Sequence, residues 1–287
     1  GDVYKRQAFD WYEKQEKNKE INEGIKKEGK KIKRDFEELK EKIIGCSVPK
    51  PLSGTLSGHS AGEPFDKYAY VEIKKIFPKN TFRQYEYLNF LYTKNLDANS
   101  RAEREKLFES PTVLFLLSRG KNATDKWSLE NPFEEKQNDT ADILVVKDGK
   151  YEIIDIKTRN VSKSAQAPNI ISAYKLAQLC AKTLDNEDFE TFTINYFAID
   201  WLLENDKLVC KETFYANLFK ANPKNLYINW AAAMQVQFHV CDLDQTFTGD
   251  MKDWAKAYLK HFVTQAKKRA DDMIKKFVKP FERYIEE

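Results

Sequence analysis

The sequence predicts an α/β fold in which a mixed central sheet is flanked by helices and preceded by a helical N-terminal extension. Three observations lead to this prediction. Two Val- and Ile-rich runs, 141–147 and 150–157, are joined by Asp148-Gly149, which is typical of a β-hairpin. Apolar and polar residues alternate at 234–240, which indicates a half-buried strand. Apolar residues recur with a helical period in three further stretches: about 62–76, 169–184 and 254–284.

Residues 1–45 are predicted to form a charged helical extension, separate from a main domain at 46–287. The apolar residues of the extension follow a spacing close to a heptad: Ile25, Ile32, Phe36, Leu39 and Ile43. This stripe fits a dimerisation or docking helix, or a helix that packs on the main domain. Because fewer than four heptads are sustained, the sequence favours packing on the main domain.

Residues 47–62 are rich in Pro, Ser and Gly and are interpreted as a linker. Gly62-Glu63-Pro64 then opens the first helix of the main domain, where an early proline is favourable. Glu63 has two interpretations: it could face a metal site, or it could complement the helix dipole, which is the commoner role of an acid in a first turn.

The Asp148-Gly149 turn sets the register of the predicted hairpin. In a two-residue hairpin the residues that flank the turn face each other, so Lys147 pairs with Lys150. The same register places Asp142 opposite Asp155. Because side chains alternate between the two faces of a strand, Lys157 shares the face of Asp155.

Two carboxylates directly opposite each other destabilise a strand pair unless something compensates their charge. A divalent cation such as Mg²⁺ fits this requirement, because it binds carboxylate oxygens and retains water and substrate phosphate as further ligands. Asp142 and Asp155 are therefore candidate metal ligands and Lys157 is a candidate catalytic residue, in a site suited to phosphodiester hydrolysis. The alternative is a solvated strand face on which Lys157 only pairs with an acid.

The polar stretch after the hairpin is predicted to lie beside this site. Arg159 and Lys163 are candidates for contacts with phosphates, because a nuclease must hold the backbone that it cuts. The alternative is an ordinary solvated loop, an interpretation that fits Lys163 better than Arg159. Gln166 and Asn169 carry amides, which are suited to contact with base edges. A turn that caps the predicted helix at 169–184 is the competing interpretation of these two residues.

The last third of the chain is interpreted as structural. Tyr227 to Trp230 leads into the predicted strand at 234–240, with Asn229 either near DNA or in a turn. The aromatic residues of the helix at 254–284 are predicted to lie in the core, and His261 on its surface.

Composition restricts the class of protein only weakly. The chain has 287 residues, with 48 Lys and Arg against 45 Asp and Glu, and a pI of about 8.4. Near-neutral charge is compatible with DNA binding if basic residues cluster locally. The four cysteines show no CxxC pair, and no apolar run approaches the ~20 residues that cross a bilayer. We therefore expect a cytoplasmic protein that has no structural zinc and no segment that crosses a membrane.

Asp142, followed after twelve residues by Asp155-Ile156-Lys157, resembles the D…(D/E)-x-K signature of the PD-(D/E)xK nuclease superfamily. Longer segments resemble the HincII family of type II restriction endonucleases from about residue 47 to the C-terminus. These segments are SGTLSGHSAGEPF (53–65), FLLSRGKNAT (115–124), EEKQNDTADIL (134–144), DIKTRNVSKSAQAPNIISAYKLAQ (155–178) and LYINWAAAMQVQFHV (226–240). Ala141 stands where many superfamily members have proline.

The resemblance implies a restriction-endonuclease-like core in a Mg²⁺-dependent homodimer that cuts double-stranded DNA at a palindrome such as GTYRAC, leaving blunt ends. It also implies that the Ile156 carbonyl completes the metal ligands and that Lys157 lies beside the attacking water. Gln166 would wedge between bases. Base edges would be contacted by Asn169, Tyr227 and Asn229.

Two copies also suit the task, because a twofold protein matches a palindromic site. Two other functions remain open from the sequence: a repair or recombination nuclease of the same superfamily, and a DNA-binding protein without catalysis. The N-terminal extension could also be an interaction module attached to the nuclease. The sequence leaves open whether a cognate DNA methyltransferase acts at the same site.

Overall fold

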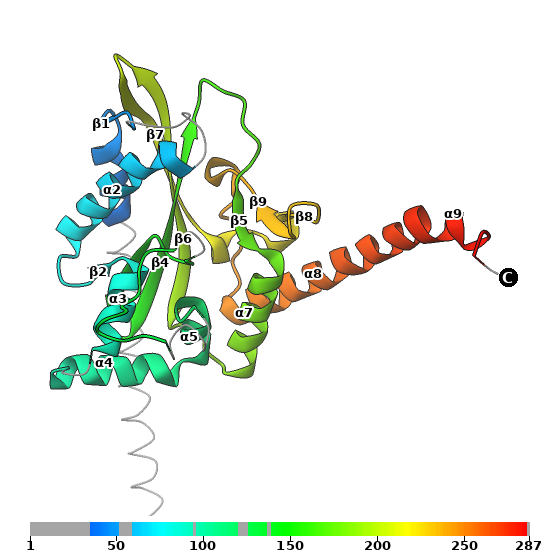
Figure 1. Cartoon of the computed structure of the whole chain (residues 1–287), viewed down its shortest axis with the longest axis horizontal. Helices are drawn as coiled ribbons and strands as arrows, with labels where there is room; N and C mark the ends of the chain where they lie inside the picture. Colours follow the sequence, from blue (N-terminus) through cyan, green and yellow to red (C-terminus); the bar gives the residue numbers. More distant parts are fainter. Residues whose placement is uncertain (1–34, 52–58, 94–95, 120–125, 137–138, 286–287) are drawn as a thin grey trace, which may run out of the picture.

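A six-stranded mixed sheet forms the centre of the computed structural model (Figure 1). The structure describes residues 35–51, 59–93, 96–119, 126–136 and 139–285. Ile25 and Ile32 of the predicted apolar stripe, and the rest of residues 1–34, lie outside the described residues. The α/β class and the mixed sheet flanked by helices are confirmed.

The strand order in the large sheet is β1-β7-β6-β4-β3-β2, with β4 and β6 parallel and the other pairs antiparallel. A second, three-stranded sheet has the order β5-β9-β8. The strands are β1 (Ser47–Pro49), β2 (Thr81–Phe82), β3 (Ile143–Lys147), β4 (Lys150–Asn160), β5 (Asn169–Ser172), β6 (Phe192–Glu204), β7 (Lys207–Asn217), β8 (Tyr227–Asn229) and β9 (Gln235–Gln237). The helices are α2 (His59–Ile76), α3 (Gln84–Tyr92), α4 (Ala98–Glu109), α5 (Pro111–Leu117), α7 (Ala173–Asp185), α8 (Met251–Met273) and α9 (Lys279–Glu282). Short helical turns are η1 (Leu218–Lys220), η2 (Pro223–Asn225), η3 (Val240–Asp242) and η4 (Ile274–Val278).

The two faces of the sheet carry separate hydrophobic cores, because side chains alternate along β3 and β4. Ile143 and Val145 belong to one core, together with Phe65, Ala69 and Ile73 of α2. Leu144 and Val146 belong to the other core, which contains residues of α3, α5, α7 and α8. Asp155 and Lys157 alternate with Ile154 and Ile156 of the α2 core. They therefore lie on the face that carries α7.

The described part of the N-terminal extension is a helix at 35–43 that contributes to the core beside α2. Phe36, Leu39 and Ile43 are fully buried there, and Phe36 stacks on Tyr215 with ring centroids 4.7 Å apart. This arrangement agrees with the favoured interpretation of a helix packed on the main domain. The proposed division into residues 1–45 and 46–287 stays a prediction.

The predicted linker contains a short strand. Ser47–Pro49 pairs with β7, and the bond from Cys210 N to Cys46 O extends this pairing. Helix α2 also begins at His59, before the predicted start at Gly62, so that Pro64 lies inside the helix.

The predicted helix at 169–184 was wrong at its start. Asn169–Ser172 forms β5 and pairs with β9, and α7 begins only at Ala173, where the Ser172 side chain accepts a hydrogen bond from Lys175 N. The β-branched residues Ile170 and Ile171 suit a strand once β9 is available as a partner. This partner is distant in sequence, which the helical periodicity of a single segment does not reveal.

The segment 227–240 forms a hairpin, β8 and β9, and not one strand with a lead-in. Asn229 makes the turn, because its Oδ1 accepts hydrogen bonds from Ala231 N and Ala232 N. Ala233 and Met234 follow with positive φ angles of 52° and 55°. Val236, Phe238 and Val240 are buried, as their alternation predicted, whereas the prediction was wrong for Met234, which is 36% exposed and precedes β9.

The prediction of core aromatics along the last helix is correct only for its first part. Trp254 and Tyr258 are fully buried and stack, whereas Phe277 and Phe281 are more than half exposed. Figure 1 shows the reason, because α8 runs past the edge of the fold and α9 lies far from the sheet. His261 is half-buried, with Nε2 lying 2.9 Å from Leu226 O, and not a free surface residue.

Of the helices in the described ranges, none combines the length and the apolar composition needed to cross a lipid bilayer.

Candidate active site

The hairpin of β3 and β4 has the predicted register. Lys147 faces Lys150 and Ile143 faces Ile154, so Asp142 lies one residue before β3, on the side of Asp155. Asp148 and Gly149 have φ angles of 51° and 76°, as a turn of this type requires at both central positions.

The strand ladder stops where the acidic residues begin. In this register Ala141 and Ile156 would form the next hydrogen-bonded pair and exchange two backbone bonds. Ala141 N instead bonds to Gln84 Oε1 at 2.9 Å, and Ile156 N donates to Asp142 Oδ2 at 2.7 Å. Because N–H and C=O of one strand residue point to the same edge, the Ile156 carbonyl faces the side of Asp142.

The charges of Asp142, Asp155 and Lys157 converge at this open edge. Lys157 Nζ lies 3.0 Å and 2.8 Å from the two carboxylate oxygens of Asp155. Burial, and after it the neighbouring charge of Asp155, raise the pKa of Asp142 to about 7, against the opposing effects of Lys157 and the Ile156 N–H. Burial lowers the pKa of Lys157, but the attraction of Asp155 and Asp142 outweighs this effect and the net pKa is raised.

Arg83 holds the backbone of Asp142 in place. Its Nη1 donates to Asp142 O at 2.9 Å, while its Nη2 pairs with Asp66 Oδ2 at 2.9 Å. Asp142 is therefore fixed by α2 and by the residue before α3, although it lies outside a strand.

The acidic cluster opens into a cleft of about 1030 Å³. One wall comes from α2 and the other from β5 and the start of α7. Glu63 also lines the cleft, but its carboxylate forms an ion pair with Lys67 at 2.6 Å. Lys175 of α7 lines the same cleft and donates from Nζ to Thr140 Oγ1 at 2.7 Å. Asp142 and Asp155 lie in the lining of this cleft, together with Lys157.

The sequence model of the family described as "Restriction endonuclease HincII" matches residues 39–285. The chain belongs to the HincII family of restriction endonucleases. Two curated relatives, both from Haemophilus influenzae, are the type II restriction enzymes HindII, at 62% identity, and HincII, at 61% identity. Each comparison spans 88% of this chain and 98% of the relative. As a member of this family, the chain is a restriction endonuclease that cleaves DNA at specific sites.

The donor set of this HincII-family site fits a small, hard divalent cation. Among the described residues no group of three His, Cys, Asp or Glu side chains lies together, so the protein offers two carboxylates and the Ile156 carbonyl. Mg²⁺ suits such a set, because it keeps several waters and completes its octahedron with substrate oxygens. Burial and the neighbouring charge of Asp155 both raise the pKa of Asp142, and a bound cation would offset the repulsion between the two acids.

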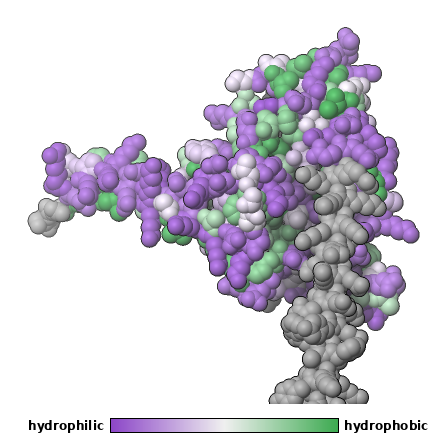
Figure 2. Space-filling view, turned by 180° about the vertical axis from the view of Figure 1, so that it is seen from behind, coloured by the Kyte–Doolittle hydropathy of each residue, from purple (hydrophilic) through white to green (hydrophobic). Residues whose placement is uncertain are grey.

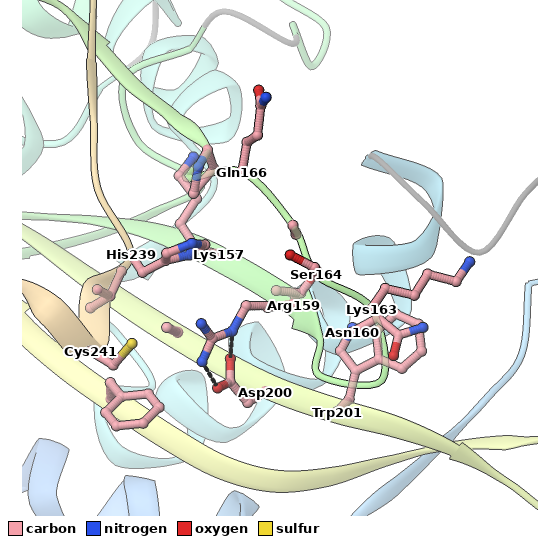
Figure 3. Close-up of a pocket in the computed structure, with 16 residues that line it drawn as sticks. Lys157, Arg159, Asn160, Lys163, Ser164, Gln166, Asp200, Trp201, His239 and Cys241 are labelled. Atoms are coloured by element: carbon pink, nitrogen blue, oxygen red, sulfur yellow. Dashed lines mark hydrogen bonds and ion pairs between the residues drawn. The ribbon is translucent and has the colours of Figure 1, made fainter. Parts of the chain in front are cut away.

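The two predicted phosphate contacts differ from each other. Arg159 lies within β4, which extends to Asn160 past the predicted end of the hairpin at 157, and only Lys163 lies in the loop after the strand. The Arg159 guanidinium is engaged with Asp200, where Nε lies 3.0 Å from Oδ1 and Nη2 bonds to Oδ2. Figure 3 shows this pair at a pocket of about 280 Å³, with Lys163 and Gln166 extending from the loop above it. Lys163 and Gln166 are exposed, whereas the Arg159 guanidinium is held by Asp200.

The predicted base contacts gather on the three-stranded sheet. Asn169 of β5 and Tyr227 of β8 both pair with Gln237 of β9, and Asn229 ends β8. Tyr227 is 62% exposed and Asn169 is also exposed. Gln166 lies apart from them on the loop before β5. The structure thus brings three of the four predicted readers together.

The sequence alone did not single out Arg83, Lys175, Asp200 or Gln237. Arg83 and Asp200 act through partners 59 and 41 residues away, Asp142 and Arg159 respectively. No local motif marks such pairs. Only Lys175 had a local signal, because a lysine at the third position of a helix opposes the helix dipole.

Proposed function

We propose that this protein is a Mg²⁺-dependent type II restriction endonuclease that acts as a homodimer on double-stranded DNA. The single observation that supports the chemistry is the convergence of Asp142, Asp155 and Lys157 at the open edge of β4. The identity of 62% and 61% to two type II restriction enzymes supports the substrate.

In the proposed reaction, the Asp142 and Asp155 carboxylates and the Ile156 carbonyl would hold Mg²⁺. The bound ion would lower the pKa of a water molecule and offset charge on the scissile phosphate. Asp155 fixes the Lys157 ammonium by ion pairing at 2.8 Å. Lys157 then orients the attacking water and stabilises the negative charge that develops on the phosphate.

The proposed target is a short palindrome of the GTYRAC type, cut to blunt ends. Asn169, Tyr227 and Asn229 would contact base edges, Gln166 would wedge between bases, and Lys163 would contact phosphates. Arg159 would reach a phosphate only with the part of its guanidinium that Asp200 leaves available. The exposed positions of Gln166, Asn169 and Tyr227 support these roles.

The proposed dimer would place one active site on each DNA strand. The exposed apolar side chains on the projecting C-terminal helix support contact with another chain: Met273, Ile274, Phe277, Val278 and Phe281. Figure 2 shows hydrophobic residues between hydrophilic ones along this helix. A cytoplasmic location and a cognate DNA methyltransferase that protects the host are further parts of the proposal, and the four free cysteines fit the former.

Digestion of a sequenced plasmid in Mg²⁺, with an EDTA control, tests the proposed function. Sequencing of every cleaved end is expected to show blunt ends at one palindrome. Ends scattered over many sequences, or ends that depend on DNA structure, would contradict the proposed specificity. Cutting that persists in EDTA would contradict the metal dependence.

A further inference from the structure

Three amide side chains form a hydrogen-bonded row across the strands β8, β9 and β5. Asn229 Nδ2 donates to Gln237 Oε1 at 3.0 Å, and Gln237 Nε2 donates to Asn169 Oδ1 at 2.7 Å. Gln237, in the middle strand, therefore connects two of the predicted base readers.

The direction of this row is set by the backbone. Asn229 Oδ1 accepts from Ala231 N at 3.1 Å and from Ala232 N at 3.2 Å. A backbone N–H can only donate, so the amide of Asn229 has one allowed orientation and presents its nitrogen to Gln237. Gln237 must then accept with Oε1 and donate with Nε2, because the reverse would place donor against donor.

The end of the row is Asn169, which is exposed. Its Oδ1 is taken by Gln237, and within the described part of the chain its Nδ2 donates to no other group. Asn169 therefore presents hydrogen-bond donors outward. Without such a partner, the side-chain amide of an asparagine could rotate and present either its oxygen or its nitrogen to the DNA.

We propose that Gln237 is a positioning residue for sequence specificity, which holds Asn169 as a hydrogen-bond donor toward an acceptor atom on a base edge. In the major groove such acceptors are purine N7, guanine O6 and thymine O4. The groups disfavoured opposite this donor are the amino groups, cytosine N4 and adenine N6. This inference rests on the proposed function, because it assigns a role at the proposed DNA surface.

The deciding variant is Gln237→Glu. A carboxylate accepts but does not donate, so it keeps the bond from Asn229 Nδ2 and draws the Asn169 amide nitrogen toward itself. Asn169 Oδ1 would then face the DNA. We expect cleavage in Mg²⁺ to persist, with relative kcat/KM at one base-pair position of the site shifted about tenfold or more toward bases with an amino group.

Two further variants keep the test independent of the folding of one protein. Asn169→Asp removes the donors directly and is expected to change the preference at the same base-pair position. Gln237→Met removes both bonds and leaves Asn169 able to turn, so the discrimination at that position should weaken. The control for charge is Gln235→Glu, which adds the same charge two residues away on β9. Gln235 faces Asn229 in the strand register and lines the cleft, but it makes none of the hydrogen bonds of the row.

The measurement is sequencing of cleaved ends from substrates with each position of the site randomised, together with thermal melting of each variant. A loss of rate that is uniform over all sequences, in Gln237→Glu and Gln235→Glu alike, would overturn the inference, because it would reflect charge alone. An unchanged base preference in both Gln237→Met and Asn169→Asp would also overturn the inference. Failure of the proposed function would appear differently, as wild-type protein without sequence-specific cutting in Mg²⁺.

Discussion

The carboxylate of Asp142 accepts a hydrogen bond of 2.7 Å from the backbone N–H of Ile156, across the point where β3 stops pairing with β4. This bond places Asp142 against β4 without making it part of the strand ladder. The Asp142 side chain is consequently tied to the residue between Asp155 and Lys157. Ile143 is the last residue of β3 that pairs with β4, and the candidate metal ligand Asp142 comes directly before it.

Asp142→Asn is expected to abolish cleavage and leave the fold intact. Asparagine can still accept from Ile156 N, but it removes one of the two negative charges that would hold the cation. Lys157→Ala should have the same effect on cleavage, because it removes the ammonium. We expect a loss of at least about a hundredfold in each variant, measured as the initial rate of plasmid cleavage. Glu72→Gln, on the far side of α2, is the control that should cut normally, and persistent cutting by both active-site variants would refute the assignment.

The stability of the metal-free protein should depend on the protonation of Asp142. Its pKa is raised to about 7 in the folded state, against about 3.9 in an unfolded chain. Between these values the folded state binds a proton that the unfolded state has released, so the free energy of unfolding falls as pH rises from about 4 to about 7. Asp142→Asn should not show this fall in the free energy of unfolding, because asparagine does not titrate. In EDTA it should be more stable than wild type at pH 8, by on the order of 1 kcal/mol, with the difference vanishing near pH 4.

Denaturant titration at both pH values measures this difference. Addition of Mg²⁺ at pH 8 should stabilise the wild type and not Asp142→Asn, because binding to the folded state alone raises stability. An equal response of the two proteins to Mg²⁺ would argue against Asp142 as a ligand.

Lys175→Met should weaken binding to DNA. Burial lowers the pKa of Lys175, its Nζ bonds to the neutral Thr140 hydroxyl, and it lies in the first turn of α7, where the helix dipole is unfavourable to a cation. A phosphate in the cleft would compensate all three effects. Binding measured at several salt concentrations, in the Asp142→Asn background, should show a salt slope reduced by about one. Lys256→Met, at an exposed position of α8, should leave the slope unchanged, and equal slopes in the two variants would exclude the contact.

Replacement of Phe277 and Phe281 by Ser should weaken the proposed dimer. Both side chains are more than half exposed on the projecting helix, so their removal costs little inside one protomer. Light scattering coupled to size exclusion should show a dimer for wild type and a larger monomer fraction for the double variant. Thermal melting at a concentration where both are monomeric should give similar midpoints. A wild type that is monomeric at all concentrations would contradict the dimer.

Local chemistry in the sequence was sufficient for the hairpin and its two acids. The Asp148-Gly149 turn specifies one register, and that register alone places Asp142 beside Asp155 and Lys157 on the face of Asp155. The alternation at 234–240 likewise predicted that Val236, Phe238 and Val240 are buried, although it was wrong for Met234. These features depend on residues within a few positions of one another, so a linear pattern contains them.

Other features required partners that are distant in the chain. Asn169–Ser172 has helical periodicity, yet it becomes a strand because β9 lies beside it. Phe277 and Phe281 have the spacing of a core stripe, yet α8 leaves the fold before it reaches them. The sequence near Arg159 shows no partner for its charge, whereas in the structure Asp200 on the neighbouring strand β6 pairs with it. The sequence determines what each residue can do, through its charge, shape and local geometry. Tertiary structure decides which of these possibilities is used, because burial and hydrogen bonding depend on groups that the fold brings from tens of residues away.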